Sequence, residues 1–228
     1  MKAKNIGIAA AFLMAGPLWL VLGGCSVDVP KAAAAGRQQT APQAAMTGFQ
    51  CVSGLNMGPR YGARAEQMEP IAGEGGCGAA YPVKLMSLGP GDRMAIQPAA
   101  TVNCGLTAAL ARWEAEVVQP SARHFFGQNV VRINQWSSYV CRTRNSRPGA
   151  RLSEHSLANA LDVASFTLAD GRVVAVESGW HQAGAEGQFL RTVHKYACPL
   201  FGTVLGPEAD RHHTNHFHLD LGRGGICQ

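Results

Sequence analysis

Two segments of the chain contain side chains that commonly bind metal ions, and they lie far apart in the sequence. The first contains His155 followed, after six intervening residues, by Asp162, and the second contains His216-Phe217-His218. Together they offer two imidazoles and one carboxylate to a metal ion, and they leave another imidazole beside it to handle protons. Three protein ligands with one open coordination position are typical of a catalytic zinc site rather than a structural one.

Simpler explanations exist for these residues. The second segment is histidine-rich, with His212, His213, His216 and His218. An adventitious metal-binding tract could account for it, but would not explain the upstream pair of His155 and Asp162. Asp162 alone could cap the end of a neighbouring strand. Ser153 with His155 could suggest a serine hydrolase, but both lie in one local segment and no nucleophile elbow surrounds the serine.

Strand geometry can bring the two segments together, because side chains alternate between the faces of a β-strand. In the expected strand 216–221, both histidines and Asp220 share one face, and the apolar side chains take the other. In the expected strand 159–168, Asp162 has only alanines beside it on its face, which leaves room above the sheet. If the strands are adjacent, the two segments converge on one ion. Asp220 is then expected to orient an imidazole or to be a surface charge, rather than to bind the metal.

The remaining secondary structure must position this site, and hydrophobic spacing predicts most of it. Apolar residues recur at helical spacing over 105–118, and Pro120 is expected to kink or restart this helix, which continues to about residue 126. Further expectations are strands at 80–88, 93–96 and 130–140, a hairpin over 159–177 with its turn at Asp170-Gly171, and a helix at 186–198. The tryptophans expected in the core rather than as saccharide platforms are Trp113, Trp136 and Trp180.

The N-terminal segments are expected to lie outside the main domain. Residues 1–24 have a short positive start, an interrupted apolar stretch and small residues at the end, as a secretory signal peptide does. The ending Leu22-Gly23-Gly24-Cys25 resembles the lipobox of bacterial lipoproteins, with a plain signal peptide as the alternative. Residues 25–48 are expected to be a disordered tether, 49–100 a Gly- and Pro-rich lead-in, and 101–228 the main domain.

Location and charge restrict the partners. With a genuine lipobox, Cys25 carries a lipid that attaches the protein to a membrane, and Ser26 favours the outer membrane by resemblance to bacterial sorting rules. The expected location is therefore the periplasm. The formal net charge is +5, and removal of the leader lowers it by two. That charge is too small and too scattered to indicate nucleic-acid binding.

The cysteines indicate a disulfide framework. The chain has seven, and setting Cys25 aside leaves an even number in an exported protein, which predicts three disulfides. Oxidised cysteines cannot act as nucleophiles, and no pair has the CxxC spacing of a cysteine zinc site. Many pairings remain open. The preferred ones, chosen mainly by locality, are Cys198–Cys227, Cys104–Cys141 and Cys51–Cys77.

The metal-binding pattern resembles that of known zinc peptidases. Ser153-x-His155-x6-Asp162 with His216-x-His218 is similar to the group of lysostaphin, D-alanyl-D-alanine peptidases and hedgehog domains, and His213 resembles the extra histidine of the murein endopeptidase branch. More closely, residues 77–227 resemble the bacterial extensin-like C-terminal family. Its marks here are Cys104-Gly105-Leu106, Trp113, Tyr139-x-Cys141-Arg142, Ser153-Glu154-His155, Asp162-Val163 and His216-Phe217-His218-x-Asp220.

The resemblance implies a role for each residue. It implies that one zinc ion per chain is bound by His155, Asp162 and His218. His216 would serve as base or stabilise the transition state, and His213 would be a nearby imidazole that faces the substrate or supports a ligand. Arg142 would meet a substrate carboxylate or the developing oxyanion, with a surface ion pair as the alternative. The chain departs from the peptidases at Leu157-Ala158, where they usually carry glycine.

These residues and the resemblance together set the expected fold and function. The fold would be α+β, with an antiparallel sheet of about four strands that carries the zinc site on one face and helices on the other, as in hedgehog domains and D-alanyl-D-alanine peptidases. The function would be a zinc-dependent peptidase of peptidoglycan peptide cross-links, cleaving D,D or L,D bonds. The alternative is a zinc-binding envelope lipoprotein that does not cleave and has a binding or regulatory role. The oligomeric state and protein partners stay open.

Overall fold

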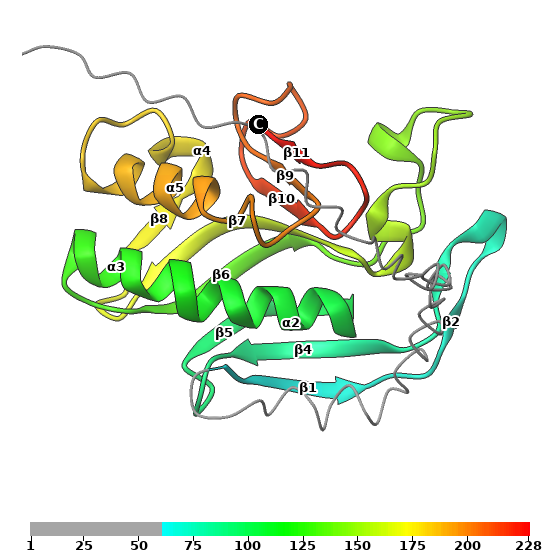
Figure 1. Ribbon diagram of the computed structural model, residues 1–228, viewed down its shortest axis with the longest axis horizontal. Coiled ribbons are helices and arrows are strands. Elements are labelled where there is room, and N and C mark those ends of the chain that lie inside the picture. The colour runs from blue at the N-terminus through cyan, green and yellow to red at the C-terminus, as the bar shows by residue number, and fades with distance from the viewer. Residues whose placement is uncertain (1–60) are drawn as a thin grey trace, which may run out of the picture. The chain divides into compact units, whose positions relative to one another are not determined.

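The protein is described by a computed structural model over residues 61–228. Most strands join in one mixed β-sheet (Figure 1). Across the sheet they follow in the order β1 (Ala63–Gln67), β4 (Pro82–Leu88), β5 (Met94–Asn103), β6 (Val130–Ser137), β7 (Ala160–Leu168), β10 (Phe217–Asp220), β9 (Thr203–Leu205) and β11 (Ile226–Cys227). A further strand, β8 (Val173–Ala175), pairs with β7. A separate two-stranded sheet consists of β2 (Ile71–Ala72) and β3 (Gly78–Ala79).

This sheet corrects the expectation of about four antiparallel strands, and with it the expected hedgehog-like architecture. The sheet has nine strands within residues 61–228, and two neighbouring pairs, β5–β6 and β9–β11, run parallel. The β5–β6 pair is parallel because the connection between the strands is a helical crossover. The strands β1, β9 and β11 were not predicted. They are five, three and two residues long, which is too short for an alternation of apolar and polar residues to be recognised.

The crossover between β5 and β6 is a helix in three parts. α2 (Cys104–Trp113) leads through a π-helical turn, Glu114–Val118, into α3 (Gln119–Phe126). The Asn103 side chain caps the start by accepting a hydrogen bond from a backbone N–H of the first turn at 2.8 Å. Pro120 lies in the first turn of α3, where its missing N–H costs nothing, so the expected restart of the helix is confirmed.

The helices cover one face of the sheet and enclose the hydrophobic core there (Figure 1). α5 (Ala185–Lys195) packs against α3, and the four-residue α4 (Val176–Gly179) packs against α5 and β7. Trp113 and Trp180 are buried in this core, as expected, and the Trp113 indole N–H donates to the Val193 carbonyl oxygen at 3.1 Å. Burial of large aromatic side chains of this kind contributes much of the folding free energy.

Alternation along β7 and β10 separates the core from a polar face. Leu161 and Val163 of β7, and Phe217 of β10, belong to the buried core cluster. Asp162 and His218, which alternate with them, therefore project from the face that the helices leave uncovered. This division was the one predicted from the sequence.

The disulfides correct two of the three preferred pairings. Cys198 is bonded to Cys227, as predicted. Cys77 is bonded to Cys141, 64 residues away, and not to Cys51. Cys104 is also disulfide-bonded, but Cys141 is not its partner. Locality in the sequence failed here because the sheet brings distant segments side by side.

Several expectations concern residues that the structure does not describe or places differently. The expected leader 1–24, the expected tether 25–48 and the lipid attachment expected at Cys25 fall on residues outside the described part of the chain. β4 and β5, predicted within the lead-in, hydrogen-bond directly into the large sheet. Over residues 61–228, no helix combines the length and the apolar character needed to cross a bilayer.

Candidate metal centre

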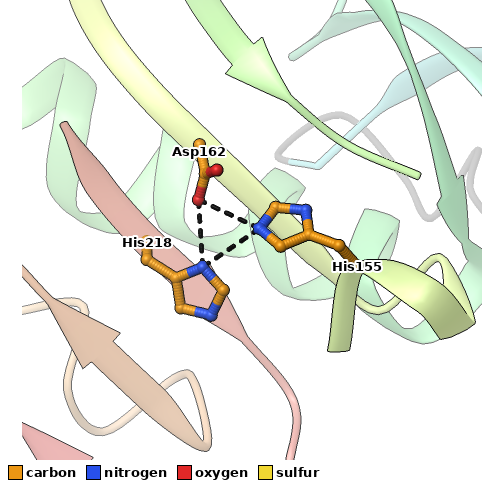
Figure 2. A group of neighbouring side chains, drawn as sticks. All are labelled: His155, Asp162 and His218. Atoms are coloured by element: carbon orange, nitrogen blue, oxygen red, sulfur yellow. Dashed lines mark hydrogen bonds and ion pairs between the residues drawn. The ribbon is translucent and has the colours of Figure 1, made fainter. Parts of the chain in front are cut away.

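Three side chains converge on the uncovered face of the sheet (Figure 2). Asp162 on β7 and His218 on β10 are register partners, with 2.9 Å between the carboxylate Oδ1 and the imidazole Nδ1. His155 reaches them from a short 3-10 helix, Glu154–Leu157, that precedes β7, and its Nε2 lies 3.1 Å from the same oxygen. The structure therefore brings together the three residues that were predicted from the sequence as metal ligands.

Local sequence explains how His155 is aimed. The Ser153 side chain caps the 3-10 helix and accepts a hydrogen bond from the His155 N–H at 3.4 Å. The helix ends at Ala158, which adopts the left-handed conformation with φ +52° and turns the chain into β7. This conformation costs an alanine about 1 kcal/mol. The turn lies in the Leu157-Ala158 dipeptide.

Hydrogen bonds fix the tautomer of both histidines. His155 Nδ1 lies 2.5 Å from the carbonyl oxygen of Ser138 and must donate to it. His218 Nε2 lies 2.9 Å from Asp220 Oδ2 and donates to that carboxylate. The remaining ring nitrogens, His155 Nε2 and His218 Nδ1, therefore turn lone pairs toward Asp162. Histidines that bind metals usually donate a hydrogen bond from the ring nitrogen that faces away from the metal. Asp220 accepts such a bond and so orients His218.

The converging atoms need a cation between them. His155 Nε2 and His218 Nδ1 lie 3.2 Å apart. When both imidazoles are neutral, these two nitrogens and the Asp162 oxygen are three acceptors without a donor. Ligand atoms around a tetrahedral zinc ion lie about 3.4 Å apart, given metal–ligand bonds of about 2.1 Å. The distances of 2.9–3.2 Å approach that spacing. The donor set and its geometry therefore fit zinc.

The ionisation of the site reflects the same convergence. Burial raises the pKa of Asp162, but hydrogen bonds from His155 and His218 and their charges outweigh it and hold that pKa well below its usual range. Burial lowers the pKa of His218, but the bonds and charges of Asp162 and Asp220 raise it to about 9. Without a metal, a proton on His218 supplies the missing positive charge.

His216 lies beside the three ligands rather than among them. Its Nε2 is 3.6 Å from Asp162 Oδ1, and its Nδ1 donates to the Asn215 side-chain oxygen at 2.9 Å. Burial, together with the neighbouring histidines, outweighs the attraction of Asp162 and lowers the pKa of His216 to about 4. The imidazole is therefore neutral at pH 7, and its free Nε2 can accept a proton.

His213 lies next to His216 and His218, farther from Asp162. Its ring centroid lies 5.3 Å from that of His216 and 5.8 Å from that of His218. Its Nδ1 donates to Asp210 Oδ1 at 2.8 Å, which leaves Nε2 free. Burial lowers the pKa of His213, although Asp210 opposes the shift. His212 is exposed and lines one of the hollows beside the centre, but it is not among the three converging side chains.

Two hollows open onto the centre, and Arg142 lines both. One, of about 150 Å³, is also lined by Arg144, Glu154, His213, His218 and Asp220. The other, of about 230 Å³, is also lined by Asn145, Asp162, His213, His216 and His218. The Arg142 guanidinium donates to the Thr143 carbonyl oxygen, at 3.5 Å, and makes no ion pair with a carboxylate within residues 61–228. Its guanidinium is therefore available to an anion in either hollow.

Sequence reasoning missed several supporting groups and misplaced one tryptophan. Ser138, Asn215 and Asp210 each hold a histidine of the site. Asn215 and Asp210 lie one and three residues before their histidines, a signal that could have been read, whereas Ser138 lies on another segment. Trp136, expected in the core, is 57% exposed, and its ring centroid lies 5.6 Å from that of His216.

Comparison with known proteins identifies a family for the chain. The family model described as extensin-like protein C-terminus matches residues 50–228. No curated protein matches the chain. No solved structure matches it either.

Proposed function

The chain belongs to the family of extensin-like protein C-termini, and from that premise we propose that it is a zinc-dependent peptidase of peptidoglycan peptide cross-links. The observation that carries the proposal is the convergence of His155, Asp162 and His218 next to a neutral, oriented His216. The resemblance of this pattern to the zinc peptidases of the lysostaphin group supports it. The proposed location is the periplasm, with the protein attached to the outer membrane through Cys25.

The three ligands would hold one zinc ion, with support behind each imidazole. A bound zinc ion would supply a Lewis acid and would lower the pKa of water from about 16 to about 7. The protein contributes the rest: Ser138 and Asp220 accept the N–H on the far side of each imidazole, so that the other ring nitrogen is the one turned toward the metal. Placement of two ligands on paired strands keeps their spacing constant.

His216 is the group proposed to move the proton. Its Nδ1 is occupied by Asn215, so only Nε2 faces the site. Its pKa of about 4 keeps it neutral over the pH range of the periplasm. It accepts a proton from the attacking water and can return it to the leaving amine. Groups in this role typically contribute about 10²- to 10⁴-fold to the rate.

Arg142 and His213 are proposed to meet the substrate. A tetrahedral intermediate carries negative charge on oxygen, and preorganised donors at that position lower the barrier. Arg142 lines both hollows and has no carboxylate partner within residues 61–228. His213 Nε2 is free because Nδ1 binds Asp210. Peptidoglycan stem peptides carry free carboxylates, which suit a guanidinium at the mouth of the site.

A non-catalytic zinc-binding lipoprotein remains the alternative, and the surrounding histidines argue against it. A binding site for zinc needs only the three ligands and their support. It does not need His216 oriented by Asn215, or His213 oriented by Asp210. Nor does it need the His213 ring to lie 5–6 Å from the rings of His216 and His218. This costly arrangement of buried imidazoles favours an enzyme.

Digestion of purified cross-linked muropeptides, read by mass spectrometry, tests the proposal. We expect cleaved products that disappear with a chelator and return with added zinc. The masses identify the bond as D,D or L,D. His216→Ala serves as the matched control, because it should keep zinc and lose turnover. Intact muropeptides with zinc-loaded wild-type protein would overturn the peptidase proposal and leave the zinc-binding lipoprotein.

A further inference from the structure

Trp136 is an exposed tryptophan at an irregular point of β6. Gln135 pairs with Val163 of β7, but Ser137 pairs with Asp162, the residue immediately before it. Trp136 is therefore the extra residue of a β-bulge, directly beside the strand position of a candidate metal ligand. Bulges re-aim side chains next to active sites. The bulge leaves 57% of Trp136 exposed, although two of its strand neighbours are buried or half-buried.

The indole lies against the proposed proton-transfer group. Its ring centroid is 5.6 Å from that of His216, with the planes tilted by 40°. One part of the indole thus packs on the site, while more than half of the residue is exposed to solvent. A ligand that covered this exposed apolar surface would gain binding free energy from its burial.

The surface next to Trp136 is polar, and it ends at the exposed Arg132 of β6, which is in register with Thr167 of β7. Asn134 of β6 is in register with Gln97 of β5 and Ser165 of β7. The Asn134 amide donates to the Ser165 hydroxyl at 2.9 Å and to the Thr167 hydroxyl at 3.2 Å. These side chains form a row of amides and hydroxyls across the face of the sheet that the helices leave uncovered. The row is continuous with the metal centre through Trp136.

We propose that Trp136 is a platform for a sugar ring of the glycan strand that carries the peptide substrate. The inference rests on the proposed function and deepens it by naming a second part of the substrate. The axial C–H groups of a sugar pack on an indole face, and its hydroxyls bond to amides. The amides and hydroxyls around Asn134 can bond to the hydroxyls of a glycan. The charged stem peptide suits the hollow that Arg142 and Arg144 line.

Tryptophan fluorescence isolates this residue. Trp113 and Trp180 are buried, at 0% and 6% exposure, so quenching by iodide in the described part of the chain reports on Trp136. Subtraction of the Trp136→Phe spectrum removes every other contribution. The probe is the tetramer of N-acetylglucosamine. We expect it to shift the Trp136 emission to the blue and to reduce iodide quenching.

Substitutions test whether Trp136 binds a sugar ring or is exposed without binding one. Trp136→Ala is expected to weaken binding of the tetramer, measured by calorimetry, by at least about tenfold, as truncation of a tryptophan at the centre of an interface does. Tyr196→Ala is the matched control, because Tyr196 is 54% exposed at the end of α5, away from the centre. It should keep full affinity. Equal affinity of Trp136→Ala and wild type, or a Trp136 response to free stem peptide and none to the tetramer, would overturn the proposal.

Two further measurements separate this inference from the peptidase proposal. His155→Ala should lose zinc and hydrolysis but still bind the tetramer, since binding needs no metal. Trp136→Ala should raise KM for cross-linked substrate that bears sugars and leave KM for sugar-free cross-linked peptide unchanged. A purely structural role for Trp136 beside His216 would instead change kcat for both substrates alike, and would contradict the platform while leaving the peptidase intact.

Discussion

His218 and Asp162 are direct partners across the β7–β10 pair, with 2.9 Å between Nδ1 and Oδ1. Their separation is set by the backbone ladder and not by a loop, so the pair is in place before any metal arrives. The third candidate ligand, His155, is held by the Ser138 carbonyl oxygen. A site preorganised in this way favours binding because little has to be ordered when the ion enters.

Removal of any one candidate ligand is expected to abolish stoichiometric zinc binding. His155→Ala, Asp162→Ala and His218→Ala each leave two ligands, which do not hold a three-ligand zinc ion. Elemental analysis after dialysis should give about one zinc per wild-type chain and almost none in the variants. His212→Ala, an exposed histidine outside the triad, should keep its zinc. Full retention in all three ligand variants would rule out this site.

Asp220→Ala tests the support behind His218. The carboxylate accepts the His218 Nε2–H at 2.9 Å and so fixes the tautomer that turns Nδ1 to the metal. We expect zinc affinity to fall by about 10- to 100-fold, the usual effect of removing such a partner. Asp210→Ala removes the equivalent carboxylate from His213, which is not a ligand, and should leave affinity unchanged. A competition titration with a chromogenic chelator measures both, and equal losses would contradict the assignment.

His216→Ala is expected to keep zinc and to lose about 10²- to 10⁴-fold in kcat. The same residue sets the acid side of the rate profile. His216 accepts a proton only when neutral, and burial lowers its pKa to about 4. With zinc in excess, activity should fall as the pH drops through about 4, and not near 6.5 where an ordinary histidine titrates. A fall centred near 6.5 would show that another imidazole carries the proton.

Much of the site could be predicted from the sequence, because its signals are local. Alternation in 216–221 and 159–168 placed His218 and Asp162 on polar faces of strands that turned out to be neighbours. The helical repeat of 105–118 and Pro120 predicted α2 and α3. These patterns depend on residues that are close in the chain, and tertiary structure did not override them.

The remainder depends on contacts between distant segments. The pairing of Cys77 with Cys141 follows from how the sheet folds, which no spacing encodes. The parallel pairing of β5 with β6 follows from the crossover between them. Trp136 looked like a core residue because strand residues of its type are usually buried. Alternation along β6 shows otherwise, because Ile133 and Gln135 are buried and Trp136 lies on the opposite face, where it is 57% exposed.

Glu114→Gln is expected to stabilise the protein at neutral pH. Glu114 is fully buried in the π-helical turn, and its closest charged partner, Arg93, is 3.9 Å away. Burial raises the pKa of Glu114 above 4.5, although Gln119, Arg93 and Arg123 oppose the shift. The folded state thus disfavours the charged form, a penalty absent below pH 4.5 and present above the raised pKa. Urea unfolding should show a gain of about 1–3 kcal/mol at pH 7 that shrinks toward pH 4. A pH-independent change would exclude this cause.

Zinc affinity should rise with pH well beyond the range of an ordinary histidine. In the metal-free protein the pKa of His218 is raised to about 9 by Asp162 and Asp220, so the imidazole carries a proton at neutral pH. Zinc must displace that proton, because only the deprotonated nitrogen binds metal. Below about pH 9 the apparent affinity should therefore increase by about tenfold per pH unit, and it should level off above that pH. The same proton contributes stability to the metal-free fold below pH 6.5, and this stability is lost as the pH rises through about 9.

Chelator competition between pH 6 and pH 10 measures how zinc affinity changes with pH. In Asp220→Ala the affinity should level off at a lower pH, because one of the two carboxylates beside His218 is gone. An affinity that is already constant from pH 7 upward would mean that no proton occupies the centre in the absence of zinc.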